Sequence, residues 1–402
     1  MNTHSIEIYT TYKYRMYRRD KSDKHLHQMI NVAGIVWNHC IALQRRYYRL
    51  TGKYIPPGRL KSHLAKLRRE TKRFAHWNQI SAQSVQASVE RLDEAYQRFF
   101  DKKAGRPGFK KVRKYKSFVL KQSNWELLEH KNPKYDRKGK LTHAIGQILI
   151  NGRLHKFIKH REMGGVIKTI TIKRDTLGNL WICFTVKETI QVPNEVSSGQ
   201  IGGFDFGLKT FLTNEQGRPY KSPQFLRAEL HRIRQLNQAL SRKQVGSHNR
   251  ERAKRALARA HIRIADKRRD AHYKLAHKIC EAYQAVVFED LNLSGMKALW
   301  GRKVSDLGFY KFLLIMKQVC LKRGVIFAQC ERFERTTQIC HACKNRQIVT
   351  LSERIFYCQK PACGLVMDRD HNAALNILYA GASALGLEIV RHLSGAVLYA
   401  QQ

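Results

Sequence analysis

The stretch "AVVFEDLNLSGM" (residues 285–296) places two acids directly after a short apolar run. Ala285 to Phe288 form a Val-rich run, which predicts a buried strand. Glu289 and Asp290 follow at its carboxyl end, where open α/β sheets bind their ligands. An alternative is that one of the two acids simply caps or solvates the strand end. The stretch therefore predicts an α/β sheet with a carboxylate at its functional edge.

A second apolar strand contains an acid of its own, in "IGGFDFGLKTFLTNEQGRPY" (residues 201–220). Asp205 stands between two phenylalanines, and folding alone does not explain a carboxylate there. The segment "NEQG" predicts a turn into a returning strand. A third apolar strand is predicted in "GVIFAQCERF" (residues 324–333).

Four of the nine cysteines form two close pairs, Cys340-x2-Cys343 and, after fourteen residues, Cys358-x4-Cys363. In a chain without a recognisable secretion signal, such pairs favour a structural tetrahedral Zn²⁺ over disulfides. Four thiolates leave no open position for water, so we expect no catalysis by this zinc. The remaining cysteines lie in apolar contexts and are predicted to be core residues, namely Cys40, Cys183, Cys280, Cys320 and Cys330.

The segment "DRDHNAALNIL" (residues 368–378) follows the second cysteine pair and leads into an apolar helix face. Capping alone can explain both Asp368 and Asp370, because aspartate is favoured at a helix N-terminus. However, one of these aspartates can also join Asp205 and Glu289 as a third carboxylate ligand of a metal ion. Three hard oxygen ligands suit Mg²⁺ or Mn²⁺, and a pair of such ions supports phosphodiester hydrolysis.

The charge of the chain points to a polyanionic partner. Its 402 residues include 75 Lys and Arg against 31 Asp and Glu, a formal net charge of +44. Such a field opposes compactness unless an anion relieves it, and nucleic acid is the natural partner. A membrane surface is the rival, but no apolar run approaches the roughly 18 residues of a membrane span. A chain of this length predicts two to four domains or subdomains.

The N-terminal half shows helices followed by strands. Apolar spacing predicts a helix over residues 26–50 and another after Ser81, a plausible N-cap. Nine Lys or Arg and no acid lie between Lys102 and Lys121, interleaved with Phe109, Tyr115 and Phe118. This pattern suits contact of the cations with a nucleic-acid backbone and stacking of the aromatic rings on its bases. Candidate contacts there are Lys110, Lys111, Arg113, Lys114 and Lys116. Short strand patterns then predict a small β-barrel or sheet, and a polar linker follows from Val192.

A long helical pair is predicted between residues 226 and 279. Its second helix has eleven Lys or Arg against three acids between Arg250 and Lys278. Such an imbalance favours a face that follows a phosphate backbone. The candidate contacts are Arg255, Arg259, Arg263, Lys267 and Arg268.

These motifs together resemble the TnpB family, nucleases encoded by insertion sequences and related to type V CRISPR effectors. The resemblance rests on "GGFDFGLKTF", "VVFEDLNLSGM", the "CHAC…YC…CG" ribbon and "DRDHNAALNI". It implies an α/β multidomain chain whose RNase H-like RuvC nuclease domain (196–335 and 367–402) is split by a zinc ribbon (336–366). It also implies a helical recognition domain (21–101) nested in a wedge-type β-barrel (1–20 and 102–195). Two departures are the four-residue cysteine spacing and Lys344, where a glycine is often found.

The resemblance also implies roles for individual residues. Asp205, Glu289 and Asp370 would be the catalytic ligands of two Mg²⁺, with Asp368 as a cap, and the four paired cysteines would hold one Zn²⁺. The implied activity is RNA-guided cleavage of double-stranded DNA beside a short motif. The guide RNA would come from the transposon end. We expect a monomer with no membrane partner, acting on nucleoid DNA in a prokaryotic cytoplasm.

Two other classes of function stay open from the sequence. One is an RNA-guided DNA-binding repressor without cleavage, against which the intact acids argue. The other is a zinc-ribbon DNA-binding accessory protein of a transposase that acts without RNA.

Overall fold

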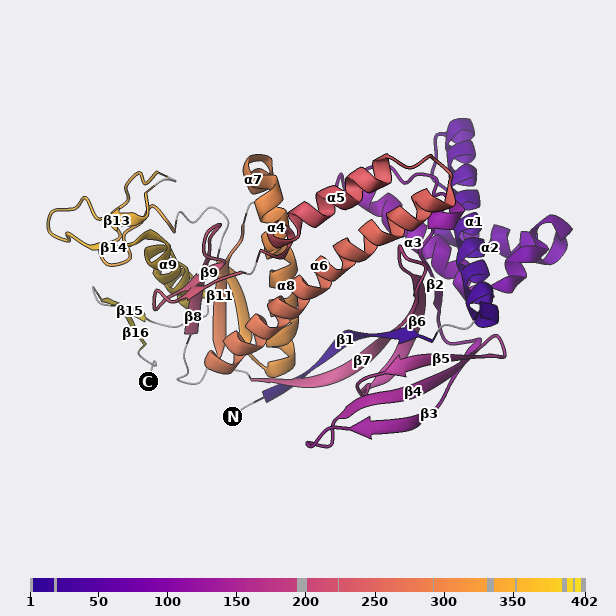
Figure 1. Ribbon diagram of the computed structural model, residues 1–402, viewed down its shortest axis with the longest axis horizontal. Helices are drawn as coiled ribbons and strands as arrows, with labels where there is room; N and C mark the ends of the chain where they lie inside the picture. Colours follow the sequence, from indigo (N-terminus) through magenta and orange to yellow (C-terminus); the bar gives the residue numbers. More distant parts are fainter. Residues whose placement is uncertain are drawn as a thin grey trace. The chain divides into compact units, whose positions relative to one another are not determined.

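The computed structural model divides into two compact units, Glu7–Thr189 and a second unit formed by Met1–Ile6 with Ile190–Gln402 (Figure 1). The structure describes residues 3–17, 20–193, 201–222, 224–291, 293–330, 336–350, 353–384, 389–392 and 395–398. Most of the predicted linker after Val192, residues 194–200, lies outside these ranges. None of the described helices has the length and apolar character needed to cross a bilayer.

The helical part of the first unit follows strand β1 (Thr3–Met16), and its helices form where the apolar spacing predicts them. The Ser81 hydroxyl accepts a hydrogen bond from the Ser84 backbone N–H at 3.1 Å, so Ser81 caps the third helix as expected. The helices are α1 (Asp20–Thr51), α2 (Pro57–Glu70), the 3₁₀ helix η1 (Lys72–Gln79), α3 (Ala82–Phe100) and the 3₁₀ turn η2 (Val112–Lys114).

The strands of this unit form one seven-stranded sheet, in the order β2-β6-β7-β1-β5-β4-β3. Asn151 and Gly152 both have positive φ (49° and 72°) and make the two-residue hairpin turn between β4 and β5. The strands are β1 (Thr3–Met16), β2 (Ser117–Leu120), β3 (Trp125–Tyr135), β4 (Leu141–Ile150), β5 (Arg153–Lys159), β6 (Val166–Arg174) and β7 (Leu180–Pro193).

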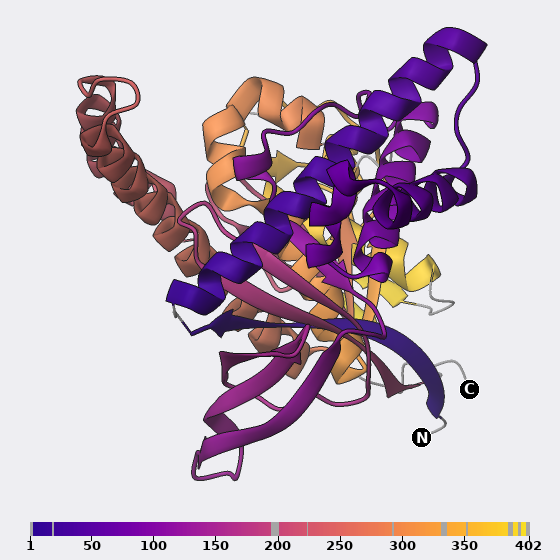
Figure 2. The same cartoon turned by 90° about the vertical axis from the view of Figure 1, so that its right-hand side faces the viewer.

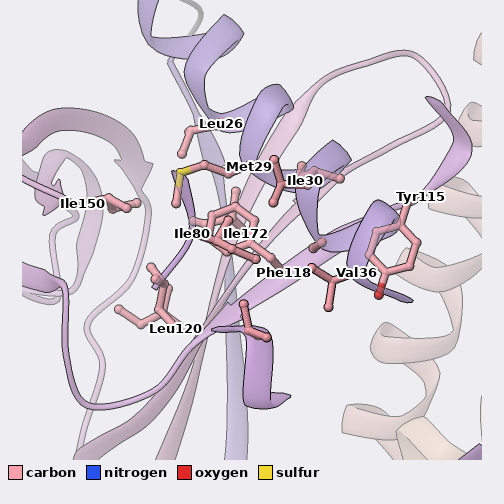
Figure 3. Close-up of a cluster of buried hydrophobic side chains, with 14 of the residues drawn as sticks. Leu26, Met29, Ile30, Val36, Ile80, Tyr115, Phe118, Leu120, Ile150 and Ile172 are labelled. Atoms are coloured by element: carbon pink, nitrogen blue, oxygen red, sulfur yellow. The ribbon is translucent and has the colours of Figure 1, made fainter. Parts of the chain in front are cut away.

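The expected barrel is not closed. Within the described residues, β2 and β3 are the two edges of the sheet and do not pair with each other. Helix α1 lies along one face of this open sheet instead (Figure 2). Its buried side chains, Leu26, Met29 and Ile30 among them, pack with Phe118 and Ile172 of the sheet in one core (Figure 3).

The second unit is built on a five-stranded sheet in the order β10-β9-β8-β11-β12. Strands β8, β11 and β12 run parallel, and β9 pairs antiparallel with β8. Strand β10 returns antiparallel beside β9 after the turn that "NEQG" predicts. The three apolar runs predicted as strands are therefore neighbours. The strands are β8 (Ile201–Phe206), β9 (Leu212–Asn214), β10 (Pro219–Tyr220), β11 (Ala285–Glu289) and β12 (Ile326–Cys330).

Helices cover both faces of this sheet, so β8 is buried along its whole length. Phe204 and Phe288 pack with Phe312 of α8 on one face, and Val287 packs with Ile377 of α9 on the other. The helices are α4 (Phe225–Ala228), α5 (Leu230–Ser241), α6 (His248–Ala282), α7 (Leu293–Leu307), α8 (Phe309–Arg323) and α9 (Arg369–Ala384). Two small hairpins complete the described chain, β13 (Ile355–Tyr357) with β14 (Val366–Asp368), and β15 (Ile389–His392) with β16 (Gly395–Leu398).

Candidate active site

Asp205 lies on the central strand β8, and its side chain is buried (5% exposed). Because side chains alternate along a strand, Asp205 shares a face with Gly203, against which α9 packs. Burial raises the pKa of the Asp205 carboxyl well above its ordinary value. The negative charges of Glu289 and Asp370 raise that pKa further, and Arg369 lowers it. The structure thus brings the three predicted carboxylates together.

Glu289 reaches this place through the register of two parallel strands. Phe288 of β11 pairs with Phe204 of β8, so the next residue, Glu289, falls beside Asp205. Burial raises the pKa of the Glu289 carboxyl, and the neighbouring charge of Asp290 adds to that increase. Both acids therefore stand at the carboxyl end of parallel strands, as the sequence predicts.

Asp370 comes to the same end from helix α9. Its Oδ2 lies 3.6 Å from the point that a Cβ on Gly207, just after β8, would occupy. Two arginines that sequence reasoning did not single out pair with it. The nearest Asp370 oxygen lies 3.2 Å from Arg369 and 3.9 Å from Arg354. No sequence pattern marks these arginines among the 75 Lys and Arg of the chain.

Asp368 does something different. It directly precedes α9, and its Oδ1 accepts a hydrogen bond from the His371 backbone N–H at 3.0 Å. This is the geometry of an N-cap, the role expected for Asp368.

Asp205, Glu289 and Asp370 repel one another at one strand end, although among the described residues only the four paired cysteines lie close enough together to hold a metal ion as they stand. The raised pKa of Asp205 records the unfavourable energy of placing like charges together in a buried position. A bound cation relieves that repulsion, and oxygen ligands of this kind suit Mg²⁺ or Mn²⁺ rather than zinc. The donor set therefore fits the metals expected from the sequence.

The four paired cysteines converge as a separate group. The Sγ atoms of Cys340, Cys343, Cys358 and Cys363 all lie within 4.8 Å of one another. Four thiolates at this spacing are compatible with one tetrahedral zinc ion. The wider spacing of the second pair does not prevent the convergence.

The residue after each cysteine pair has a left-handed backbone. Lys344 has φ of 59° and Gly364 has φ of 55°, and their N–H groups donate to Cys340 O and Lys360 O. Glycine adopts this conformation without strain, which explains why a lysine at position 344 is a departure from the expected pattern.

Two asparagines that the sequence reasoning did not assign hold the ribbon to α9. The Asn372 side chain accepts from His341 N–H at 2.9 Å and donates to Ile339 O at 2.8 Å. The Asn376 amide donates to Ile339 O at 2.7 Å and to Thr336 O at 2.8 Å. The sequence feature that could have identified these two residues is a pair of amide side chains four residues apart on an otherwise apolar helix face.

Two family models and several curated relatives match this chain. The family model described as "Probable transposase" (OrfB_IS605) matches residues 182–299, and "Cas12f1-like, TNB domain" matches residues 309–377. A "Putative RNA-guided DNA endonuclease" of Streptomyces pristinaespiralis is 26% identical over 94% of this chain and 90% of its own length. "Putative RNA-guided DNA endonuclease InsQ" of Escherichia coli (strain K12) is 26% identical over 93% and 92%.

Another relative matches a shorter part of the chain. "TnpB-like protein L79" of Acanthamoeba polyphaga mimivirus is 27% identical over 53% of this chain and 43% of its own length. The chain belongs to the TnpB family. Its α/β fold is Cas12f-like. The protein in "Cryo-EM structure of the Cas12f1-sgRNA-target DNA complex" matches with a TM-score of 0.55 and 14% identity, over 92% of this chain and 98% of that one.

In this TnpB-family chain the basic segment after α3 is only partly as predicted. All five candidate cations, Lys110, Lys111, Arg113, Lys114 and Lys116, are exposed. Of the interleaved aromatic residues, Phe109 is 55% exposed, but Tyr115 and Phe118 are buried. Both buried rings belong to the core against α1, so the prediction that they stack on nucleic acid is wrong.

Helix α6 of the TnpB-family chain presents a cationic stripe. Arg255, Arg259, Arg263 and Lys267 are exposed and follow one another at four-residue intervals, so they share one face. Arg268 departs from the prediction. Its guanidinium donates to Ser305 O at 2.7 Å and Asp306 O at 3.0 Å, which ties α6 to α7.

Proposed function

We propose that this chain is an RNA-guided DNA endonuclease of a transposable element that cuts target DNA beside a short motif. The observation that carries the proposal is the meeting of Asp205, Glu289 and Asp370 at one sheet edge. Membership of the TnpB family and the names of the two bacterial relatives support it.

The domain organisation is part of this proposal. An RNase H-like RuvC nuclease domain would occupy residues 196–335 and 367–402, split by the zinc ribbon at 336–366. The parallel strands β8, β11 and β12 and the cysteine group between β12 and α9 support it. Residues 21–101 would be the helical recognition domain. Residues 1–20 and 102–195 would be the wedge part, here as an open sheet.

Asp205, Glu289 and Asp370 would hold two Mg²⁺ ions. When bound, these ions activate a water molecule and stabilise the leaving oxygen of the phosphodiester. The fold of the chain would hold these three ligands in fixed positions. Asp205 and Glu289 sit on paired parallel strands, and the cap on Asp368 fixes the first turn of the helix that positions Asp370. Rigid ligands of this kind lower the cost of organising the site.

One Zn²⁺ on the four cysteines would have a structural role. The ribbon is small and has little apolar surface to bury, so a metal would stabilise it. The hydrogen bonds of Asn372 and Asn376 would then transmit the rigidity of the ribbon to α9.

The partners would be a guide RNA from the transposon end and a double-stranded DNA target. Guide pairing selects the sequence, so the protein mainly follows a heteroduplex backbone, which accounts for the net charge of +44. We infer a monomer that acts on nucleoid DNA in a prokaryotic cytoplasm.

The first test is to purify the chain, measure its absorbance before and after RNase, and sequence the bound RNA. With that RNA as guide, we expect Mg²⁺-dependent cleavage of matching DNA. Asp370→Asn should abolish the cleavage, and the matched variant Asp368→Asn should keep it, since asparagine also caps helices. Absence of bound RNA, or cleavage that Asp370→Asn spares, would overturn the proposal.

Other outcomes would identify the rival functions. Guided DNA binding without cleavage at any Mg²⁺ concentration would indicate a repressor. Sequence-specific DNA binding that survives RNase would indicate a transposase accessory protein.

A further inference from the structure

An aromatic pocket lies in the helical part of the Glu7–Thr189 unit, which contains neither the three carboxylates nor the four paired cysteines. It has a volume of about 330 Å³ and opens between the ends of α1 and α3. This volume falls in the range of small-ligand sites. Five aromatic side chains line it, namely Tyr48, Tyr54, Tyr96, Phe99 and Phe100.

The rings form a fixed wall with exposed faces. The Tyr54 ring centroid lies 5.3 Å from that of Tyr96 and 5.6 Å from that of Phe100, at 88° to the latter ring. Such edge-to-face packing orders the wall without any ligand. Phe100 is nevertheless 50% exposed and Tyr48 is 56% exposed, so both offer ring surface to an incoming group.

The polar groups of the pocket are mostly engaged. The Gln44 side chain bonds both backbone groups of Ile55, at 2.8 and 3.0 Å, and the Tyr54 hydroxyl donates to Asp93 at 2.8 Å. The Tyr96 hydroxyl differs, because it is buried and has no hydrogen-bond partner among the described residues. An unpartnered buried hydroxyl of this kind is uncommon and favours a ligand that supplies the partner.

The surroundings favour an anionic ligand. Arg106 lines the pocket, is exposed and has no ion-pair partner within the described chain. The nearby acids are already engaged, Asp93 by Tyr54 and Asp101 by Lys103 at 3.0 Å. The positive charge of Arg106 disfavours a cationic ligand in this aromatic pocket and favours a flat ring that carries a phosphate.

We propose that this pocket binds an unstacked nucleobase from a single-stranded segment of nucleic acid. The base contacts the exposed rings of Tyr48 and Phe100, its edge meets the Tyr96 hydroxyl, and the adjoining phosphate meets Arg106. The inference rests on the nucleic-acid binding in the proposed function but not on cleavage. RNA and DNA share this chemistry, and the test distinguishes between them.

The test uses the full-length chain without Mg²⁺ and short single-stranded RNA and DNA oligonucleotides carrying 5-bromouracil bases. We expect ultraviolet light to crosslink the bases to Tyr48, Tyr54 or Phe100, as mapped by peptide mass spectrometry. The Tyr48→Ala/Phe100→Ala double variant should weaken binding about tenfold, from the usual value of stacking per base. It should leave the slope of log Kd against log salt unchanged, whereas Arg106→Gln should lower that slope by about one.

Tyr9→Ala is the matched control, since Tyr9 is an exposed aromatic residue (67%) on β1 of the same unit and does not line the pocket. Its affinity should equal that of the unmodified chain, and thermal melting of every variant checks folding. A weakening confined to RNA or to DNA supports the pocket and identifies the strand. Unchanged affinity in the folded double variant, or crosslinks mapped only elsewhere, overturns the pocket proposal alone. Failure of the unmodified chain to bind either strand overturns the proposed function as well.

Discussion

Asp368 and Asp370 are two residues apart, yet the start of α9 separates their roles. Asp368 stands before the first helical residue and accepts the His371 N–H, while Asp370 stands inside the first turn and lies near Gly207. A side chain before the helix can reach its free N–H groups, and one inside the turn projects outward. The backbone, rather than the chemistry of aspartate, therefore distinguishes the two acids.

Replacing Asp205 with Asn should stabilise the metal-free chain and destroy the metal response. The change replaces a buried carboxyl, whose charge is disfavoured by burial and by Glu289 and Asp370, with a neutral amide, so the melting midpoint without divalent metal should rise by at least about 2 °C. Cleavage should fall by at least about a hundredfold, because even residues that only support a metal ligand matter by that factor. Calorimetry with and without Mg²⁺ measures the first effect and a cleavage assay the second. A lower metal-free midpoint would contradict the geometry described.

Glu215, just after β9, makes the stability of the folded chain depend on pH, and this effect does not involve a metal ion. Burial raises the pKa of its carboxyl from 4.5 to about 7, partly offset by the hydrogen bond that the Tyr283 hydroxyl donates at 2.9 Å. Its other oxygen, Oε2, is buried without a partner in the described structure. A raised pKa favours the folded state at low pH, so this contribution is present below about pH 4.5 and is lost as pH rises through about 7.

Glu215→Gln should remove that pH dependence. At pH 8 the variant should be more stable than the unmodified chain by up to roughly 3 kcal/mol, at about 1.4 kcal/mol per pKa unit. Near pH 4.5 the two chains should be alike. Urea unfolding at both values measures the difference, and equal pH profiles for the two chains would refute the role of Glu215.

At the scale of elements, one close contact sets the position of the site. Helix α9 packs so tightly on β8 that a Cβ on Gly203 would lie 2.3 Å from Ala374 O and 2.7 Å from Leu378 Cβ. Only glycine permits this approach. The same helix carries Asp370 in its first turn and is tied to the ribbon by Asn372, so its height above β8 determines where the third carboxylate lies.

Gly203→Ala should therefore damage both stability and cleavage. The helix must move, at a cost of about 1–3 kcal/mol for an overpacked core position. Asp370 moves with it, so cleavage should fall more than the unfolded fraction explains. Gly301→Ala in α7 is the control, because its added Cβ meets nothing within 4 Å. Equal stability of the two variants in urea unfolding would refute the close packing of α9 on β8.

At the scale of the whole molecule, the distribution of charge matters more than its sum. Within the part of the chain that the structure describes, Arg255, Arg259 and Arg263 of the stripe on α6 form no ion pair, whereas Lys267 lies 3.8 Å from Glu229. Elsewhere on the same helix, Arg269 and Lys274 pair with Asp266 and Asp270 at 2.9 and 2.7 Å. The unpaired stripe should therefore contribute most to nucleic-acid binding.

Changing Arg255, Arg259 and Arg263 to Gln should weaken binding of all sequences alike. For every arginine that touches a phosphate, its removal should lower the slope of log Kd against log salt by about one. The control is the double variant Arg269→Gln/Lys274→Gln. Both side chains already pair with acids of the same helix, so their replacement should change the slope little. Salt titrations of affinity test this, and equal slopes for both variants would exclude the stripe as a phosphate-binding face.

Prediction from the sequence failed where burial depends on partners distant along the chain. Tyr115 and Phe118 lie in a cationic segment, but α1, more than sixty residues earlier in the sequence, covers them. The local pattern of apolar and charged residues is the same for a covered ring as for an exposed one. The barrel expectation failed for a related reason, since strand patterns do not state whether the first and last strands of a sheet pair.

The sequence by itself indicated most of the elements, the candidate oxygen and sulfur ligands and an anionic partner. Strand runs, cysteine spacing and net charge are local or additive properties, and they depend little on the path of the chain. Only the tertiary structure decided that Asp205, Glu289 and Asp370 come near one another and that Asn372 joins the ribbon to α9. Those facts depend on strand register and on the close approach that Gly203 allows, which are set by contacts between segments distant in the sequence.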